Sequence, residues 1–576
     1  MRPVLALLAA VAVVCLPAVG LARARPVHAP APPPAAAASP GPHSMVAAAN
    51  PAAVEAGLKV LRAGGTAVDA AVAVQVTLGL VEPQSSGLGG GSFMTFYDGR
   101  THRLTSYDGR EFAPAGATAD MFMDGGRPMS YPQAVLSGRS AGVPGAIAML
   151  YMAHKQHGVR PWGSLFGDAE QLAEGGFTVG KRLETILNSP FPPQNSAPDV
   201  LRYFTKPDGT KVKAGDRIQN PAYAATLRLI AAQGPDGLLK GKVAADIVRR
   251  LSEGPTPGSM TLADLAAYKP IERQAICRPY RAYTVCAPGL PSGGSATLEG
   301  LGLLEHTDIA SRGPTDAQAW LELAQAERLM YADRDRYIGD PGFVDVPLEG
   351  LLSPAYLADR AKLIGETAGP APAPGNPPGA KMAGIDSTLE PGGTTSFAIV
   401  DKWGNVVSMT TTVESIFGDG RMVDGFFLNN QLTDFAYNPV DKDGRPAANA
   451  VAPRKRPRSA MSPLIILDKD GRFYAAIGSP GGPSIISYVM KATVGLLDWK
   501  LSIQDAINLP NLVARGDSFS SEPQRYPPGV VDALAAKGVV FRQGFGEDSG
   551  LHGIVVKDGH LEGAADPRRE GVAKGF

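Results

Sequence analysis

One stretch of the sequence, Gly393–Thr412, constrains the fold more than any other. β-branched and apolar residues fill two short runs within it, and Gly404-Asn405 between them is typical of a tight turn. The stretch therefore predicts a hairpin of two strands. Pairing the two runs across a five-residue loop places Thr394 opposite Thr412, so that two hydroxyl groups lie within reach of each other.

The segment before this hairpin has a different character. From Gly369 to Gly393 it is rich in proline, glycine and alanine, a composition that buries too little apolar surface to become ordered at low cost. We therefore expect a flexible segment, 369–393, that meets a strand at Thr394.

Thr394 at this junction has two interpretations. It can be an ordinary threonine that favours a strand. Alternatively, its hydroxyl can cleave the Gly393–Thr394 peptide bond, after which the new α-amine is the base that activates the same hydroxyl. In the second case, the hydroxyl of Thr412 would support the nucleophile.

Several longer motifs resemble those of one protein family. They are TTSFAIVDKWGNVVSMTTTVESIFG, FFLNNQLTDFA, KRPRSAMSP and GSPGGPS in the second half of the chain, and GLGGGSFM, GREFAP, SAGVPGAIAML, LADLAAYKPIERQ and AERLMYADRDRYIGDP before them. With these motifs the chain resembles the γ-glutamyltranspeptidase family of N-terminal-nucleophile hydrolases over nearly all of its length after the leader. The resemblance implies an α/β fold, a four-layer αββα sandwich of two stacked antiparallel sheets flanked by helices, and no cofactor.

The chain is expected to have four parts. Residues 1–24 resemble a signal peptide, because a positively charged start precedes an apolar core that is too short and too rich in alanine for a membrane span. A Pro/Ala-rich tether, 25–44, follows. Self-cleavage would divide the remainder into a large chain, 45–393, and a small catalytic chain, 394–576. The mature protein is expected in the periplasm or outside the cell, without a membrane span.

The resemblance implies four catalytic residues. Thr394 would be the nucleophile and Thr412 its hydrogen-bond support. Gly481 and Gly482 would direct two backbone N–H groups at the developing oxyanion, since only small residues permit so close an approach. Without the resemblance, these glycines would indicate a simple turn.

The resemblance assigns substrate-binding residues as well. Arg110 would hold the α-carboxylate of a γ-glutamyl donor with its planar guanidinium. Glu414, Gln431 and Asp434 would hold the donor's α-ammonium group, although acids at such places are more often solvated. Two carboxylates that converge on one pocket repel each other unless a cation joins them, and a γ-glutamyl donor supplies that cation.

Two departures from the family pattern affect this pocket. Ser459 matches the first of two serines that assist carboxylate binding, but Ala460 stands where many members have the second, and losing one hydroxyl would weaken donor binding by about 1 kcal/mol. The loop between Phe435 and Lys455 is shorter than in well-known members and has no tyrosine near its middle. We therefore expect an open pocket and a larger share of hydrolysis relative to transfer.

The function predicted in this way is that of a γ-glutamyltransferase and glutathione hydrolase, which passes the γ-glutamyl group of glutathione-like donors to water, amino acids or peptides. One alternative is a glutaryl-cephalosporin acylase of the same fold, but a glutaryl group has no amine to pair with Glu414 and Asp434. A second is a serine hydrolase, because Gly138–Gly142 has the GxSxG pattern around Ser140, after a short apolar run and before an expected helix. A third is an exported, catalytically silent binding protein.

Composition excludes other classes of function. Acidic and basic residues balance at 55 each, which argues against nucleic acid or anionic lipid as the main partner. The basic run Arg454–Arg458 is expected to be a solvated loop. The chain has no HExxH or CxxC motif, so no metal is expected. Cys277 and Cys286 flank a predicted hairpin and can either form a disulfide or remain two buried thiols.

The remaining elements are expected to be scaffold. Asn50-Pro51 begins a helix that ends at Gly64-Gly65, and a second helix follows from about 67 to 80. The glycine-rich run Gly87–Phe93 lacks the lysine of a phosphate-binding loop, so we expect close backbone packing there. Residues 145–363 are expected to be mostly helical, with Thr315 as the cap of the longest helix.

Overall fold

The structure is a computed structural model that describes residues 43–388, 390–542 and 548–576. The predicted signal peptide, 1–24, and nearly all of the predicted tether, 25–44, lie outside the described residues. Among the helices of the described ranges, none combines the length and the apolar composition that crossing a membrane requires.

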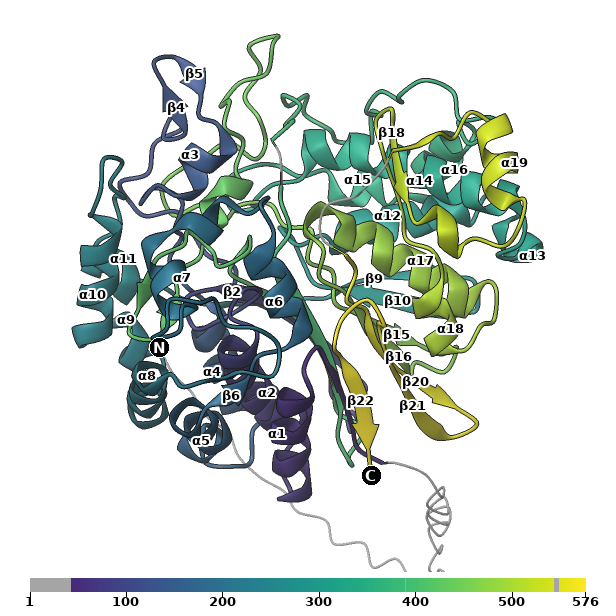
Figure 1. Cartoon of the computed structure of the whole chain (residues 1–576). Helices are drawn as coiled ribbons and strands as arrows, with labels where there is room; N and C mark the ends of the chain where they lie inside the picture. The colour runs from purple at the N-terminus through teal and green to yellow at the C-terminus, as the bar shows by residue number, and fades with distance from the viewer. Residues whose placement is uncertain (1–42, 389, 543–547) are drawn as a thin grey trace, which may run out of the picture. The chain divides into compact units, whose positions relative to one another are not determined.

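Two antiparallel sheets form the centre of the fold (Figure 1). The first consists of β1 (Met45–Ala48), β2 (Gly91–Tyr97), β3 (Leu104–Asp108), β8 (Ile271–Arg273), β11 (Thr394–Val400), β12 (Val406–Thr412) and β22 (Val572–Gly575). The second consists of β9 (Ile276–Tyr280), β10 (Tyr283–Ala287), β15 (Leu464–Leu467), β16 (Phe473–Gly478), β20 (His552–Lys557) and β21 (His560–Ala565). The strand orders are β22-β1-β11-β12-β2-β3-β8 and β21-β20-β16-β15-β10-β9.

Helices cover the outer face of each sheet. The first sheet carries α1 (Pro51–Arg62), α2 (Ala67–Val81) and α4 (Ala146–His157), and the second carries α12 (Gly294–Leu304), α17 (Ile485–Leu497) and α18 (Ile503–Asn508), with α14 (Ala317–Tyr337) packed on α12. On the inner side, β11 and β12 face β16 and β20 of the other sheet. The predicted αββα sandwich is therefore confirmed.

The other elements surround these four layers. The helices are α3 (Tyr131–Val135), α5 (Gly167–Gly175), α6 (Lys181–Asn188), α7 (Pro198–Tyr203), α8 (Pro221–Gln233), α9 (Asp236–Leu239), α10 (Gly241–Leu251), α11 (Leu262–Ala266), α13 (Ile309–Arg312), α15 (Leu348–Leu351), α16 (Pro354–Ala361) and α19 (Val530–Ala536). The short strands are β4 (Met123–Asp124), β5 (Arg127–Pro128), β6 (Phe177–Thr178), β7 (Arg217–Ile218), β13 (Met422–Val423), β14 (Phe426–Phe427), β17 (Leu512–Arg515), β18 (Ser518–Ser521) and β19 (Phe541–Arg542).

Alternation along β11 decides which way its side chains point. Phe397 and Ile399 belong to the core beneath the helices, whereas Ala398 and Val400 belong to the core between the sheets. Because side chains alternate along a strand, Thr394 lies on the same face as Ala398 and Val400. The strand therefore directs Thr394 toward the space between the two sheets.

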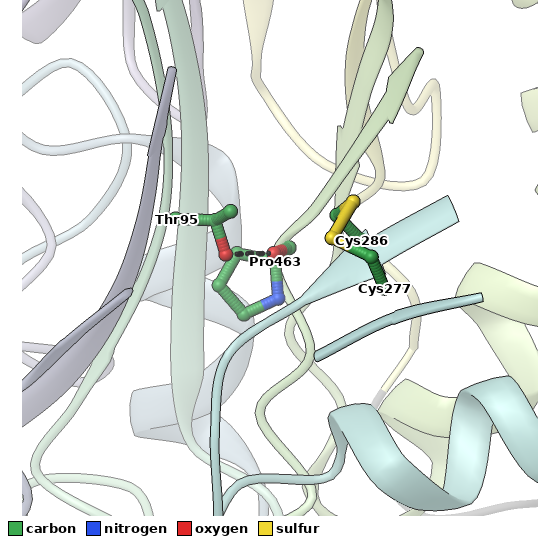
Figure 2. Close-up of a disulfide and its surroundings, with 4 residues drawn as sticks. All are labelled: Thr95, Cys277, Cys286 and Pro463. Atoms are coloured by element: carbon green, nitrogen blue, oxygen red, sulfur yellow. Dashed lines mark hydrogen bonds between the residues drawn. A yellow bond between two sulfur atoms is a disulfide. The ribbon is translucent and has the colours of Figure 1, made fainter. Parts of the chain in front are cut away.

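Figure 2 shows one contact between the two sheets and one within the second sheet. The hydroxyl of Thr95 on β2 donates to the carbonyl of Pro463, one residue before β15, at 2.7 Å, which joins the two sheets. Cys277 on β9 and Cys286 on β10 form a disulfide across their hairpin. The hairpin prediction is confirmed, and of the two states left open for the cysteines, the structure has the bridge.

The predicted helix starts are confirmed at α1 and wrong at α14. The side chain of Asn50 accepts from the Ala52 amide at 2.9 Å, as expected of a cap. At α14 the capping residue is Asp316 and not Thr315, because the Asp316 carboxylate accepts from the Gln318 amide at 2.8 Å.

Strand β1 has an unusual position in the first sheet. It pairs with β11 on one side and with β22 on the other, both of which come from residues 394–576. Just before it, the amides of His43 and Ser44 donate to the carbonyl of Phe576 at 2.9 and 3.1 Å. The end of the predicted tether is thus already part of the folded body.

Candidate active site

The hairpin of β11 and β12 has the register expected from the sequence. Val400 pairs with Val406, and Thr394 therefore pairs with Thr412. The Thr394 hydroxyl donates to the Thr412 hydroxyl across 3.1 Å. The predicted proximity of the two hydroxyl groups is confirmed.

The Thr412 hydroxyl connects Thr394 to the peptide bond that precedes it. It donates to the carbonyl oxygen of Gly393 at 3.0 Å, and it accepts from the Glu414 amide at 2.8 Å. A chain of hydrogen bonds thus runs from the Thr394 hydroxyl to the Gly393 carbonyl. The same two groups are the nucleophile and the electrophile of the expected self-cleavage.

One pocket gathers all but one of the residues predicted for the site. It is lined by Arg110, Glu390, Pro391, Thr394, Thr412, Glu414, Gln431, Asp434, Ser459, Ala460, Met461, Gly482 and Ile485. Gly481 lies outside this lining, one residue before Gly482. The pocket forms where β11 begins and β12 ends, and where the chain leaves β3 and β16.

Arg110 lies buried at one wall of the pocket. Its guanidinium donates to the Asp434 carboxylate at 2.5 Å and to the carbonyls of Pro457 and Arg458 at 3.1 and 2.7 Å. These contacts fix the plane of the guanidinium. It is therefore positioned to receive a carboxylate beside Asp434.

Gln431 and Asp434 lie at the two ends of one turn of 3₁₀ helix, Gln431–Asp434. The Gln431 amide nitrogen donates to the Asp434 carboxylate at 2.6 Å. The Gln431 carbonyl oxygen is buried and has no hydrogen-bond partner within the described part of the chain. A buried acceptor without a donor is costly, so this oxygen favours a ligand that brings N–H groups.

Glu414 is held in an unusual backbone conformation, with φ of 80°, two residues after β12. The side-chain amide of Asn430 donates to its carboxylate. Burial raises the pKa of Glu414 well above its ordinary value, and the charge of Asp434 raises it further. Burial also raises the pKa of Asp434, against the effect of Arg110. The two acids thus favour a bound cation between them.

Glycines permit close approach on two sides of the pocket. A Cβ atom on Gly90 would lie 2.0 Å from the carbonyl oxygen of Thr412, which confirms the close packing expected of the glycine-rich run. Gly481 has φ of 134°, a conformation that L-residues with side chains rarely adopt. A Cβ atom on Gly482 would lie 3.0 Å from the Cα of Gly392, so the segment before Thr394 fits tightly against Gly482.

The solvated loop predicted for Arg454–Arg458 is wrong. Only Arg454 and its neighbour Pro453 are exposed, whereas Lys455, Arg456 and Arg458 are buried. The Lys455 ammonium donates to the carbonyls of Ala448 and Ala450 at 2.7 and 2.8 Å. The buried basic groups contact carbonyls of the same loop and acids distant in sequence, such as Glu390 beside Arg458. Local composition does not reveal these partners.

The context expected of a nucleophilic serine is not found at Ser140. The segment before it is a short helix, α3, and not a strand. The Ser140 hydroxyl is buried and donates to the carbonyls of Val135 and Ser137, at 2.9 Å each. Ser140 therefore has a structural role in this turn, and it does not line the pocket.

Sequence reasoning missed several residues at the site. Glu390 and Pro391 line the pocket, although the sequence indicated only a flexible segment there. Asn430 holds Glu414, and the Arg569 guanidinium donates to the Thr394 carbonyl at 3.0 Å. The paired asparagines at 429–430, set among apolar residues, were a usable signal for Asn430. No local signal pointed to Arg569.

The chain is similar to known proteins over nearly its whole length. The family model described as gamma-glutamyltranspeptidase matches residues 53–576. A Bacillus subtilis (strain 168) protein named glutathione hydrolase proenzyme is 36% identical over 93% of this chain and 92% of its own, and an Escherichia coli (strain K12) protein of the same name is 37% identical over 91% and 90%. The crystal structure of a cephalosporin acylase from Bacillus halodurans is similar with a TM-score of 0.82 at 25% identity, covering 96% of this chain and 99% of that one. The chain therefore belongs to the γ-glutamyltranspeptidase family.

Proposed function

We propose that the protein is a γ-glutamyltransferase and glutathione hydrolase that first cleaves itself between Gly393 and Thr394. The observation that carries this proposal is the pocket itself, in which a buried arginine adjoins the carboxylates of Glu414 and Asp434 beside the Thr394 hydroxyl. The side-chain oxygen of Gln431, which has no hydrogen-bond partner among the described residues, lies in the same pocket. A γ-glutamyl group offers the complementary pair, an α-carboxylate and an α-ammonium, on one carbon. Its relatives named glutathione hydrolase proenzymes support the same assignment.

The first step converts the uncut chain into two. The Thr394 hydroxyl oxygen attacks the Gly393 carbonyl carbon, the peptide C–N bond breaks, and the hydroxyl proton ends on the released α-amine of Thr394. Thr412, 3.0 Å from the carbonyl oxygen, stabilises the charge that develops there. Water then hydrolyses the ester, which leaves a carboxylate at Gly393 and restores the hydroxyl. The products are a large chain that ends at Gly393 and a small chain, 394–576.

The second reaction repeats this chemistry on a bound donor. The free α-amine of Thr394 accepts the hydroxyl proton while the oxygen attacks the γ-glutamyl carbonyl carbon, and the proton passes to the leaving amine. The N–H groups of Gly481 and Gly482 stabilise the oxyanion. Water or an acceptor amine then takes the glutamyl group from the ester. No cofactor enters either reaction, and the short loop between Phe435 and Lys455 would favour water as the acceptor.

The competing activity is that of an acylase that removes glutaryl groups, which the similarity to a cephalosporin acylase makes the second candidate. The two donors differ in one group, because glutaryl lacks the α-ammonium. We expect γ-glutamyl-p-nitroanilide to be cleaved with at least about tenfold higher kcat/KM than glutaryl-p-nitroanilide, since hydrogen bonds to charged groups contribute about 1.5–3 kcal/mol each. Initial rates for the two anilides measure this ratio. A preference for the glutaryl donor would contradict the proposal.

Glu414→Gln tests whether the charge of Glu414 causes the preference for the γ-glutamyl anilide. The amide keeps the size of the side chain and removes its charge, so kcat/KM for the γ-glutamyl anilide should fall about 10- to 100-fold, whereas that for the glutaryl anilide should change little. Because burial raises the pKa of Glu414, the wild-type preference should also decline on acidification at a higher pH than an ordinary glutamate would cause. Equal losses for both anilides would assign Glu414 a structural role.

Ala460→Ser tests the departure from the family pattern. Ala460 lines the pocket beside Ser459, and an added hydroxyl there can donate to the donor carboxylate. We expect KM for the γ-glutamyl anilide to fall about fivefold, which corresponds to about 1 kcal/mol, with kcat within a factor of two. Ser459→Ala is the matched control and should raise KM. An unchanged KM in the Ala460→Ser protein would show that this hydroxyl does not reach the donor.

A further inference from the structure

Glu390, four residues before Thr394, is held by two buried arginines. Arg334 on α14 donates to the two carboxylate oxygens at 3.3 and 3.0 Å, and Arg458 donates to one of them at 2.6 Å. The side chains of both arginines are fully buried, and that of Glu390 is 5% exposed. Three charge-assisted hydrogen bonds therefore fix this carboxylate.

The surroundings make this ion pair costly to break. Although burial alone would raise it, the pKa of Glu390 is held well below its ordinary value by Arg334 and Arg458. Asp335 also contacts Arg515, at 2.7 Å, and Asp386 lies 3.1 Å from Arg458. The cluster thus contains three acids and three arginines, namely Glu390, Asp335, Asp386, Arg334, Arg458 and Arg515. Withdrawing the Glu390 carboxylate would therefore leave a buried positive charge without its partner.

The other end of the same short segment is fixed at the scissile bond. Thr412 donates to the Gly393 carbonyl, and Gly393 fits so closely that a Cβ atom there would lie 2.4 Å from the carbonyl carbon of Ser415. Only Pro391 and Gly392 separate Gly393 from Glu390. Residues 390–393 are thus fixed at both ends, at one by the Glu390 carboxylate and at the other by Thr412.

We propose that Glu390 is a positioning residue for self-cleavage, because Arg334 and Arg458 anchor its carboxylate and thereby keep the Gly393 carbonyl carbon within reach of the Thr394 hydroxyl. The inference rests on the proposed cleavage at Gly393–Thr394 and leaves its chemistry unchanged. The preceding residues, rich in proline and glycine, supply few side chains to restrict the segment. Fixing an electrophile beside its nucleophile removes much of the entropic cost of the step.

Glu390 would have this positioning role only before cleavage. After cleavage, Gly393 ends in a carboxylate within a pocket that already holds Glu414 and Asp434, and the repulsion favours departure of residues 391–393. The donor then binds where those residues lay. Loss of the Glu390 anchor should therefore slow the appearance of the two chains.

The test follows cleavage in newly made full-length chains. Wild type, Glu390→Gln, Glu390→Asp and the control Glu366→Gln are produced by cell-free synthesis with a labelled pulse, and the chain beginning at Thr394 is quantified against time. Glu366 suits as a control because its side chain is 81% exposed and lies before the same segment. We expect the half-time of cleavage to lengthen at least tenfold in Glu390→Gln, less in Glu390→Asp, and not at all in Glu366→Gln. For each protein, kcat is also measured per mole of cleaved chain, so that turnover is compared at equal amounts of the chain that begins at Thr394.

Two further variants separate positioning from folding. In a Thr394→Ala background, Glu390→Gln should retain a cooperative thermal transition, which shows that the slow chain is folded. Arg334→Gln should slow cleavage as well. Combining it with Glu390→Gln should lengthen the half-time of cleavage by less than a further twofold, because both substitutions remove the same ion pair. Cleavage of Glu390→Gln at the wild-type rate, or an unfolded Glu390→Gln together with Glu390→Asp cleaving at the wild-type rate, would overturn the inference. A wild-type chain that stays uncut would instead contradict the proposed function.

Discussion

Thr394→Ala should yield a single uncut chain without γ-glutamyl turnover. The substitution removes the hydroxyl that lies 3.1 Å from Thr412 and adjoins the Gly393 carbonyl, so neither the first nor the second reaction has a nucleophile. We expect turnover of γ-glutamyl-p-nitroanilide to fall by at least about 10³-fold, as is common when a nucleophile is lost. Intact mass and N-terminal sequencing of the purified protein measure the cleavage, and anilide hydrolysis measures the turnover.

Two further variants serve as controls for Thr394→Ala. Thr394→Ser keeps a hydroxyl and should still be cleaved, although more slowly. Ser140→Ala should behave as wild type in both assays, because its hydroxyl is used in two bonds to backbone carbonyls. Two chains in the Thr394→Ala protein, or loss of turnover in Ser140→Ala alone, would remove Thr394 from its proposed role.

The second large effect is expected at Arg110. Arg110→Lys keeps a positive charge but loses the planar fork that contacts Asp434 and would hold the donor's α-carboxylate. We expect kcat/KM for the γ-glutamyl anilide to fall about 100-fold, mainly through KM, since charge-assisted hydrogen bonds contribute about 1.5–3 kcal/mol each. Cleavage into two chains should persist, because the scissile bond carries no such carboxylate.

The donor itself provides the control for Arg110. A 4-aminobutyryl anilide has the amine of the γ-glutamyl donor but lacks its α-carboxylate, so wild type and Arg110→Lys should cleave it at similarly low rates. Arg273→Lys is the matched protein control, because Arg273 also pairs with a buried acid, Asp108, but does not line the pocket. Equal losses of Arg110→Lys on both anilides would indicate a disturbed fold.

The parts of the site that sequence predicted are those fixed by local pattern or by the family resemblance. The register of β11 and β12 follows from alternation and from the turn between them, so the pairing of Thr394 with Thr412 was predictable. The resemblance supplied Arg110, Glu414, Gln431 and Asp434, which the fold brings to one pocket.

The parts that sequence missed depend on partners far along the chain. Arg458 is separated from Glu390 by 68 positions, and its local neighbours suggested a solvated basic loop. Likewise, the composition around Glu390 indicated flexibility, because the two arginines that bind its carboxylate lie outside the segment. A buried ion pair forms only in the tertiary structure, so the sequence around one residue does not identify its partner.

The position of β1 has a consequence for the proposed two-chain protein. After the cut, β1 of the large chain would lie between two strands of the small chain, while β12 would pair with β2 and β15 with β10 across the same divide. The chains would thus be interleaved within both sheets and would share four ladders of backbone hydrogen bonds. Dissociation of the two chains would require the sandwich to unfold. The cut would therefore free the α-amine of Thr394 while the two chains remain bound to each other.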